Sequence, residues 1–138
     1  MLKKPLRNML CMMVAICSLS VFASCLKEGD EVKFLGVVTE ELYFGPPGWG
    51  EDKGNDQKIH QWILHLNKSL TCIQDADTDK QNWNVDIQLI MYDKNGYKTK
   101  NNLLGKEVTV VGTIFLAQTA YHMTSVLLSD ASFIMADK

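Results

Sequence analysis

The sequence predicts an all-β fold, a small OB-like barrel of five to six strands, with a two-layer β-sandwich as the alternative. Apolar residues alternate over Val32–Thr39 and again over Val108–Phe115, as in strands that bury one face. Each of these segments carries a glycine in the same phase, Gly36 and Gly112. A glycine inside a strand marks a bend or a close approach of another backbone. An OB-type barrel requires these two strands to pair with each other.

The first 24 residues have the layout of a secretory signal peptide. Three basic residues lie within the first seven, an apolar run extends from Met9 to about Phe22, and the small residues Ala23 and Ser24 follow. The apolar run is too short and wrongly flanked for a membrane-spanning helix. We therefore expect residues 1–24 to be removed on export.

The end of this segment, Phe22-Ala23-Ser24-Cys25, resembles a bacterial lipobox. The resemblance implies that Cys25 carries acyl chains such as palmitate and becomes the first mature residue. The chain would then be lipid-anchored to the cell envelope, at the outer membrane with a periplasmic or surface face, without a spanning helix. The alternative is an ordinary signal peptide followed by a chance cysteine. Residues 25–31 are expected to be a polar tether, and 32–138 a single β-barrel domain.

The charge balance of the expected mature chain argues against polyanionic partners. The 138-residue sequence has 14 basic and 16 acidic residues, and all three basic residues of the signal segment leave with it. The remaining 114 residues hold 11 lysines, no arginine and a net charge of −5. Binding to nucleic acid or to anionic lipid head groups needs a basic face. We expect no nucleic-acid partner.

The rest of the chain divides into strands separated by turn signals. The segment 60–66 is expected to be a strand, 69–74 to continue the sheet, and 85–92 to form another strand. The sequence Asp93-Lys94-Asn95-Gly96 is a strong turn signal. A short helical turn over 97–104 should end at Gly105, and the last strand should follow the 118–124 connection.

The longest loop is expected between residues 45 and 56, which hold two of the three prolines. Long loops in compact domains are often functional. Trp49 is a large apolar side chain among polar ones. It is either an aromatic binding surface or a plug for the barrel end. Binding candidates in and near this loop are Trp49, Asp56 and Trp62, and His122 lies in the last hairpin.

Alternate carboxylates at Asp75, Asp77 and Asp79 form the most metal-like pattern. Such a spacing can converge on calcium, which prefers oxygen ligands. The position at which an EF-hand requires glycine is Lys80 here, so an EF-hand is not expected. The alternatives are a looser calcium loop or a solvated acidic turn. No other cofactor is expected.

Cysteine and histidine patterns give no catalytic signature. With Cys25 acylated, Cys72 would be the one cysteine left in the domain, so no internal disulfide is expected, and Cys72 is interpreted as a buried hydrophobe rather than a reactive thiol. His60 and His65 should face opposite sides of one strand. The sequence has no zinc, nucleophile-elbow or phosphate-loop motif. Nothing favours an enzyme.

Several blocks of the sequence resemble one family. They are Gly45-Pro46-Pro47 with Trp49, then Leu104-Gly105-Lys106 and Gly112-Thr113-Ile114-Phe115, then Thr119-x-x-His122-x-Thr124. In this order they resemble the small exported bacterial proteins grouped as domain of unknown function 4431. The resemblance implies an exported domain and no particular activity. The family pattern is richer in histidine near the last hairpin, where this chain has Leu116, Gln118, Tyr121 and Met123 beside His122.

Two functions follow from these observations as hypotheses. The first is a non-catalytic envelope lipoprotein that binds a small molecule, glycan or protein through its Gly-Pro-Pro-x-Trp loop. The second is a metal-dependent or catalytic domain around His122, which requires an acid or a second histidine beside that residue. The marker of the first hypothesis is an exposed Trp49 beside Tyr43 or Trp62, and a fully buried Trp49 would remove its basis.

Overall fold

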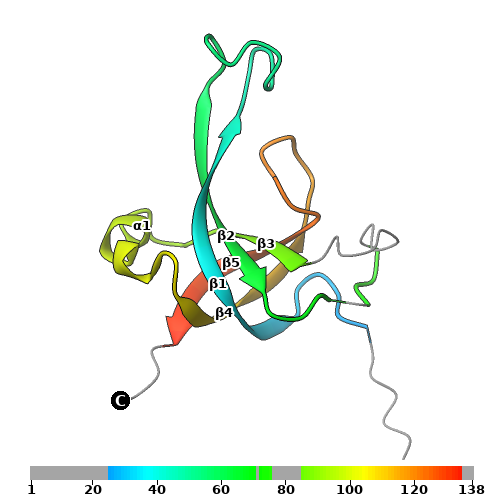
Figure 1. Ribbon diagram of the computed structural model, residues 1–138. Helices are drawn as coiled ribbons and strands as arrows, with labels where there is room; N and C mark the ends of the chain where they lie inside the picture. The colour runs from blue at the N-terminus through cyan, green and yellow to red at the C-terminus, as the bar shows by residue number, and fades with distance from the viewer. Residues whose placement is uncertain (1–24, 71, 76–84, 135–138) are drawn as a thin grey trace, which may run out of the picture.

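The computed structural model describes residues 25–70, 72–75 and 85–134. Five strands and two short helical segments follow one another along the chain (Figure 1). The elements are β1 (Glu31–Phe44), β2 (Lys58–Leu66), β3 (Asp86–Leu89), α1 (Gly96–Thr99), η2 (Asn101–Leu103), β4 (Glu107–Leu116) and β5 (Val126–Ile134).

The five strands form one mixed sheet that closes in a ring, in the order β1-β2-β3-β5-β4 and back to β1. The closing contact joins β1 to β4 in an antiparallel register that pairs Val32 with Gly112 and Gly36 with Val108. β3 and β5 pair in parallel, and the other pairs are antiparallel. The predicted pairing of the first strand with the Val108 strand is confirmed. The strand count and order are those expected of an OB-type barrel, although the ring is not a regular barrel.

Gly36 lies where β1 passes between two neighbours, because it pairs with Leu66 of β2 as well as with Val108 of β4. A Cβ atom at Gly36 would be 2.3 Å from the carbonyl oxygen of His65. Gly112 makes a similar approach on β4, with a Cβ position 2.9 Å from the Ser129 carbonyl oxygen. The close backbone approach that the sequence predicted at both glycines is therefore confirmed.

The alternating side chains of the strands fill the ring. The inward set includes Val38, Trp62 and Leu64, which are almost completely buried. Tyr97 lies in α1 and packs edge-on against the Trp62 ring, with centroids 5.6 Å apart. Burial of these large apolar side chains is the main favourable term in the stability of such a fold. The remaining buried core side chains are Ile73, Ile87, Leu89, Met91, Leu103, Val108, Val110, Ile114, Val126, Leu128 and Ala131.

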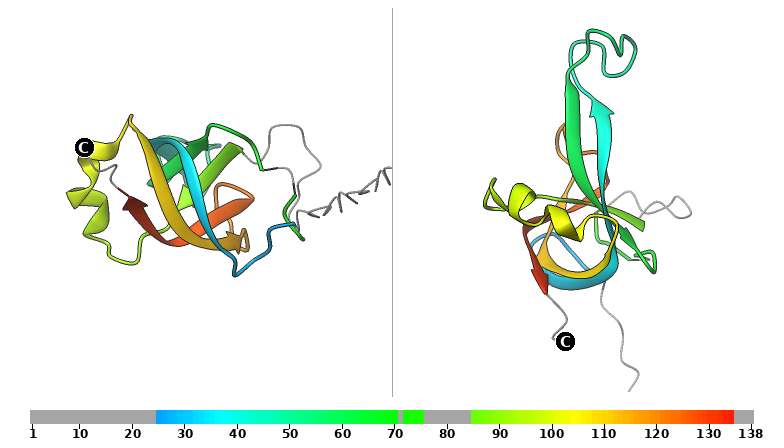
Figure 2. Two further views of the ribbon diagram at one scale, coloured as in Figure 1. Left: turned by 90° about the horizontal axis from the view of Figure 1, so that it is seen from below. Right: turned by 60° about the vertical axis from the view of Figure 1, so that its left-hand side comes forward.

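Beyond the ring, β1 and β2 continue as a two-stranded arm. There the pairing runs from Glu41 opposite Gln61 to Phe44 opposite Lys58. Figure 2 shows this hairpin standing away from the ring, with the loop that joins β1 to β2 at its tip. The first strand thus extends to Phe44 and positions the proline-rich loop.

Three expected features differ. The described residues of 69–74 do not continue the sheet as a strand, because among them only Ile73 forms an isolated bridge, to Leu26. β3 is shorter than the expected 85–92, although the Ile90 amide still donates to the Leu128 carbonyl at 2.8 Å. The segment expected as a free tether lies against the sheet, where the Gly29 amide donates to the Ile114 carbonyl at 2.9 Å.

A disulfide joins Cys25 to Cys72, with Cα atoms 4.8 Å apart. The expectation of no internal disulfide is therefore wrong, and so is the interpretation of Cys72 as a buried hydrophobe, since this residue is exposed. Backbone bonds between the segments, from the Leu26 amide to the Cys72 carbonyl at 3.0 Å and from the Gln74 amide to the Leu26 carbonyl at 2.7 Å, bring the two cysteines together.

Within the described ranges, none of the helices has the length and apolar character needed to span a bilayer.

Candidate functional site

The loop between β1 and β2, residues 45–57, is organised by one buried carboxylate. Asp56 is only 6% exposed. Its Oδ1 accepts the Gly48 amide at 2.6 Å, and its Oδ2 accepts the Gly50 amide at 2.7 Å and the Asp52 amide at 3.2 Å. Hydrogen bonds to a charged acceptor are stronger than neutral ones. Asp56, expected as a ligand-binding residue, instead uses both oxygens to hold the loop.

The loop between β4 and β5, residues 117–125, is held by a buried amide. Gln88 on β3 is 3% exposed. Its Oε1 accepts the Met123 amide at 2.6 Å, and its Nε2 donates to the Tyr121 carbonyl at 3.3 Å. The Gln88 backbone amide also donates to Thr124 Oγ1 at 2.9 Å. The loop is thereby fixed over the outer face of β3.

Replacing Gln88 by leucine is expected to lower the free energy of unfolding by about 1–3 kcal/mol, because the Met123 amide loses its acceptor inside the protein. The apolar volume at the site is nearly unchanged, so the loss reports the hydrogen bonds. The measurement is urea unfolding, with hydrogen exchange at Met123 as the local readout. Gln61→Leu is the control, since among the described residues the Gln61 side chain makes no hydrogen bond. Equal stability of the two variants would contradict the role assigned to Gln88.

The two loops meet through a pair of aromatic rings. Trp49 from the first loop and Tyr121 from the second are in edge-to-face contact, with centroids 5.2 Å apart. Both remain open to solvent, at 43% and 44% exposure. Trp49 has a φ of +51°, a backbone conformation that is unfavourable for a bulky residue. The Trp49–Tyr121 pair is thus an exposed aromatic surface on two anchored loops.

A chain of polar groups lies on the same outer face of the sheet as Gln88. His65 Nδ1 lies 2.7 Å from Asp86 Oδ1, and His65 Nε2 lies 2.8 Å from Thr39 Oγ1. The Thr39 hydroxyl donates to Glu41 Oε1 at 2.9 Å. His60 is on the opposite face of β2, where its Nδ1 lies 3.1 Å from Glu40, as the sequence predicted.

Tyr43 adds a phenol to this outer face. Partial burial raises its pKa above the ordinary value of 10.0, and the negative charges of Glu41 and Asp86 raise it further. The hydroxyl therefore stays neutral throughout the physiological range and can both donate and accept a hydrogen bond.

The other candidates from the sequence do not join this surface. Trp62 is 2% exposed and belongs to the core. His122 Nδ1 accepts the Gln118 amide at 2.9 Å, and its ring meets Phe115 edge-on at 5.4 Å. Among the described residues, no carboxylate pairs with His122 and no group of three or more acidic, histidine or cysteine side chains could hold a metal. Of the proposed calcium ligands, Asp77 and Asp79 lie outside the described residues.

Sequence reasoning missed Tyr121 and Gln88. Tyr121 stood among the residues that replace histidine in the last hairpin. Its contact with Trp49 crosses 72 positions of the chain, and no local pattern indicates such a pairing. The role of Gln88 could have been suspected from the sequence, because it is a polar residue between the apolar Ile87 and Leu89, which are buried.

The fold and the loops define a mostly-β protein with a five-stranded ring and an aromatic pair at the meeting point of its β1–β2 and β4–β5 loops. Residues 86–131 match the model of a family described as domain of unknown function (DUF4431). The match covers the chain from the start of β3 into β5, so it includes Gln88 and Tyr121 and leaves the 45–57 loop outside. No curated protein and no solved structure matches the chain.

Proposed function

We propose that the protein is a non-catalytic, lipid-anchored binding domain of the bacterial envelope that holds a neutral glycan on the Trp49–Tyr121 pair. The observation that carries the proposal is the contact of these two half-exposed rings from separate loops. In OB-type barrels the β1–β2 and β4–β5 loops are a usual place for oligosaccharides. Apolar faces of sugar rings pack on aromatic side chains, which combine a large apolar surface with a polar edge.

The surroundings of the pair suit a sugar better than an ion. Gln61 and Tyr43 lie on the outer face of the arm that carries the Trp49 loop, and they offer donors and acceptors for hydroxyl groups. The negative charge of the mature chain disfavours a polyanion. Asp56 and Gln88 fix the two loops before a ligand arrives, which lowers the entropy lost on binding.

The backbone at Trp49 gives a second line of support. A tryptophan with positive φ costs of order 1–2 kcal/mol relative to glycine. Strained residues of this kind cluster at functional sites. Glycine adopts the same conformation without this cost. A glycine at position 49 would therefore favour stability, and the presence of tryptophan favours a binding role.

Affinity electrophoresis through gels containing neutral polysaccharides tests the glycan proposal. We expect wild-type protein to be retarded by at least one of a panel of glucans, mannans and xylans. Trp49→Gly and Tyr121→Ala should each lose the retardation, and Trp49→Gly should remain about as stable as wild type because the strain is relieved. Tyr92→Ala is the control, since Tyr92 is the most exposed large hydrophobic side chain of the described residues and lies away from both loops.

The proposal would be wrong in either of two outcomes. One is that no polysaccharide of the panel retards the wild-type protein. The other is that Trp49→Gly and Tyr92→Ala are retarded as strongly as wild type, which would place binding elsewhere on the molecule.

The lipid anchor makes a separate prediction at Cys25. Acylation uses the Sγ atom that the disulfide with Cys72 occupies, so one molecule carries either the lipid or the disulfide. We expect the intact mass of protein extracted from membranes to show an acylated Cys25. Cys25→Ser should leave the membrane fraction, and Cys72→Ser should remain in it. Soluble protein with both cysteines in the disulfide would contradict the anchor.

A further inference from the structure

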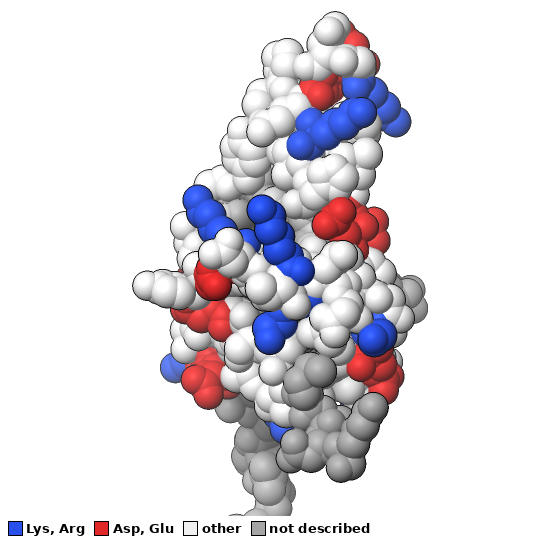
Figure 3. Space-filling view, turned by 90° about the vertical axis from the view of Figure 1, so that its left-hand side faces the viewer, with Lys and Arg blue, Asp and Glu red and all other residues white. Residues whose placement is uncertain are grey.

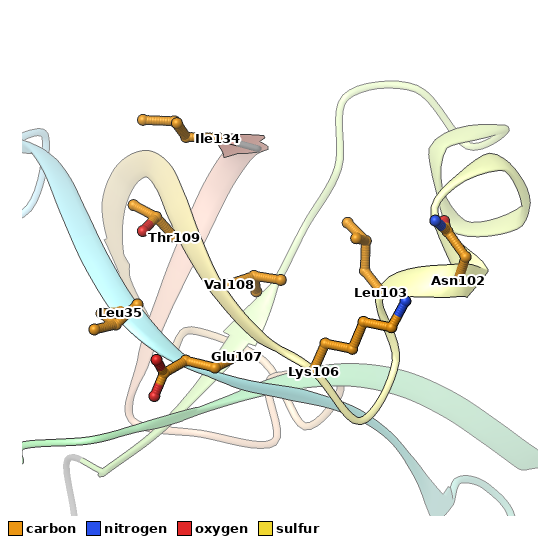
Figure 4. A pocket seen from close by; sticks show the side chains of 8 residues that line it. All are labelled: Leu35, Asn102, Leu103, Lys106, Glu107, Val108, Thr109 and Ile134. Atoms are coloured by element: carbon orange, nitrogen blue, oxygen red, sulfur yellow. The ribbon is translucent and has the colours of Figure 1, made fainter. Parts of the chain in front are cut away.

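A groove at the other end of β4 is separate from the aromatic pair. Its apolar side chains are Leu35 of β1, Leu103, Val108 of β4 and Ile134 of β5, and its volume is about 340 Å³. Leu35 and Ile134 are exposed. They lie in one row across the sheet, because both pair with Thr109. We call this hollow the Leu35 groove (Figure 4).

The polar groups of the groove are divided between its two sides. In Figure 4 the Lys106 side chain extends toward Leu103 and Asn102, whereas the Glu107 carboxylate points to the Leu35 side. Glu107 Oε2 accepts a hydrogen bond from Asn67 Nδ2 at 2.7 Å, which holds it there. Within the described part of the chain, no carboxylate lies within ion-pair distance of Lys106. One side therefore presents a cation and an amide donor, and the other presents apolar surface together with the Glu107 carboxylate that Asn67 holds.

The charge around the groove differs from that of the whole domain. Residues 94–106 contain four lysines and no acidic residue, although the expected mature chain has a net charge of −5. Figure 3 views this side of the molecule, where lysine side chains lie interspersed with acidic ones. Asp93 and Glu107 flank this segment, and Lys106 is the lysine of the segment that lines the groove. A small anionic head group would be attracted to this side.

We infer that the Leu35 groove binds a single-chain amphiphile with a carboxylate head, of the medium-chain fatty acid class. The head group lies at Lys106 and Asn102, and the chain lies over Leu35, Val108 and Ile134. A volume of about 340 Å³ is at the small end of ligand pockets, which fits one short chain and not a two-chain lipid. This site does not depend on the aromatic pair.

Titration of ¹⁵N-labelled protein with decanoate, below its micelle concentration, tests the inference. Saturable shifts are expected at the amides of Leu35, Val108 and Ile134. Octanoate should bind roughly fifteenfold more weakly, because it buries two fewer methylenes than decanoate. Lys106→Glu should weaken decanoate binding at least tenfold and leave decanol binding unchanged. Lys58→Glu is the matched control, with the same charge change on the distant arm, and should bind decanoate as wild type does.

Three outcomes would overturn the inference. The groove amides do not shift with decanoate, or Lys106→Glu and Lys58→Glu weaken binding equally, which would indicate a general charge effect. In the third, the protein does not bind decanoate but sediments with phosphatidylglycerol vesicles in a way that depends on Lys106. The groove would then be a membrane contact and not a site for a free amphiphile.

Discussion

Gly36→Ala is expected to lower the free energy of unfolding by about 1–3 kcal/mol, because a methyl group there overlaps the backbone of the neighbouring strand. The new Cβ would be 2.3 Å from the carbonyl oxygen and 2.9 Å from the carbonyl carbon of His65. Neither atom can move freely, since His65 pairs with Val37 in the β1–β2 ladder. The gain from a stiffer unfolded chain, about 0.4–1 kcal/mol, is too small to offset this overlap.

Gly54→Ala is the matched control for that measurement. The nearest atom to a Cβ at Gly54 is 3.5 Å away, an ordinary contact, and the residue lies in the exposed loop at the tip of the arm. Urea unfolding followed by circular dichroism should show a lower midpoint for Gly36→Ala and no loss for Gly54→Ala. Equal midpoints would mean that β1 does not pass between β2 and β4 as closely as the ring requires.

Asp56→Ala is expected to release the 45–57 loop and abolish binding at the Trp49–Tyr121 pair. Three backbone amides, those of Gly48, Gly50 and Asp52, lose their acceptor. The cost is about 1–3 kcal/mol. The ring itself should stay folded, because the loop lies at the end of the arm. Hydrogen exchange at these amides is the direct measurement, and protection should fall there and not in β4.

The control for Asp56 is Asp52→Ala. The Asp52 carboxylate is exposed and accepts one bond, from Asn55 Nδ2 at 2.7 Å. Its removal should leave the Gly48 and Gly50 amides protected and the affinity unchanged. The role of Asp56 is contradicted if both variants exchange alike. If the loop amides of Asp56→Ala lose protection and the variant still binds polysaccharide, binding does not need the loop conformation that Asp56 holds.

The closed ring could be predicted because its signal is local. Gly36 and Gly112 occupy the same phase in two strands of alternating pattern, and a close backbone approach needs such a residue. That phase predicted the pairing of β1 with β4, which the register confirms. Trp62 was named as a binding candidate from its residue type, but its place in β2 buries it in the core.

The binding surface could be predicted only in part. Trp49 was identified because a large aromatic side chain stands in a polar loop, and the structure shows it exposed. Its partner is Tyr121 and neither Tyr43 nor Trp62, since loops far apart in sequence meet only after the ring closes. The Cys25–Cys72 disulfide also joins residues far apart in the sequence, across 47 positions. Because Cys25 was expected to be acylated, it was not considered as a disulfide partner.

The most direct test of the central claim is the Trp49 indole signal in a ¹H–¹⁵N spectrum during titration with the neutral polysaccharide fragments that retard the protein. If the two loops together form the binding surface, the Trp49 indole resonance of wild-type protein shifts to saturation, and the shift is absent in Tyr121→Ala. An indole signal that stays in place at full ligand occupancy, or that shifts equally in Tyr121→Ala, would contradict the account.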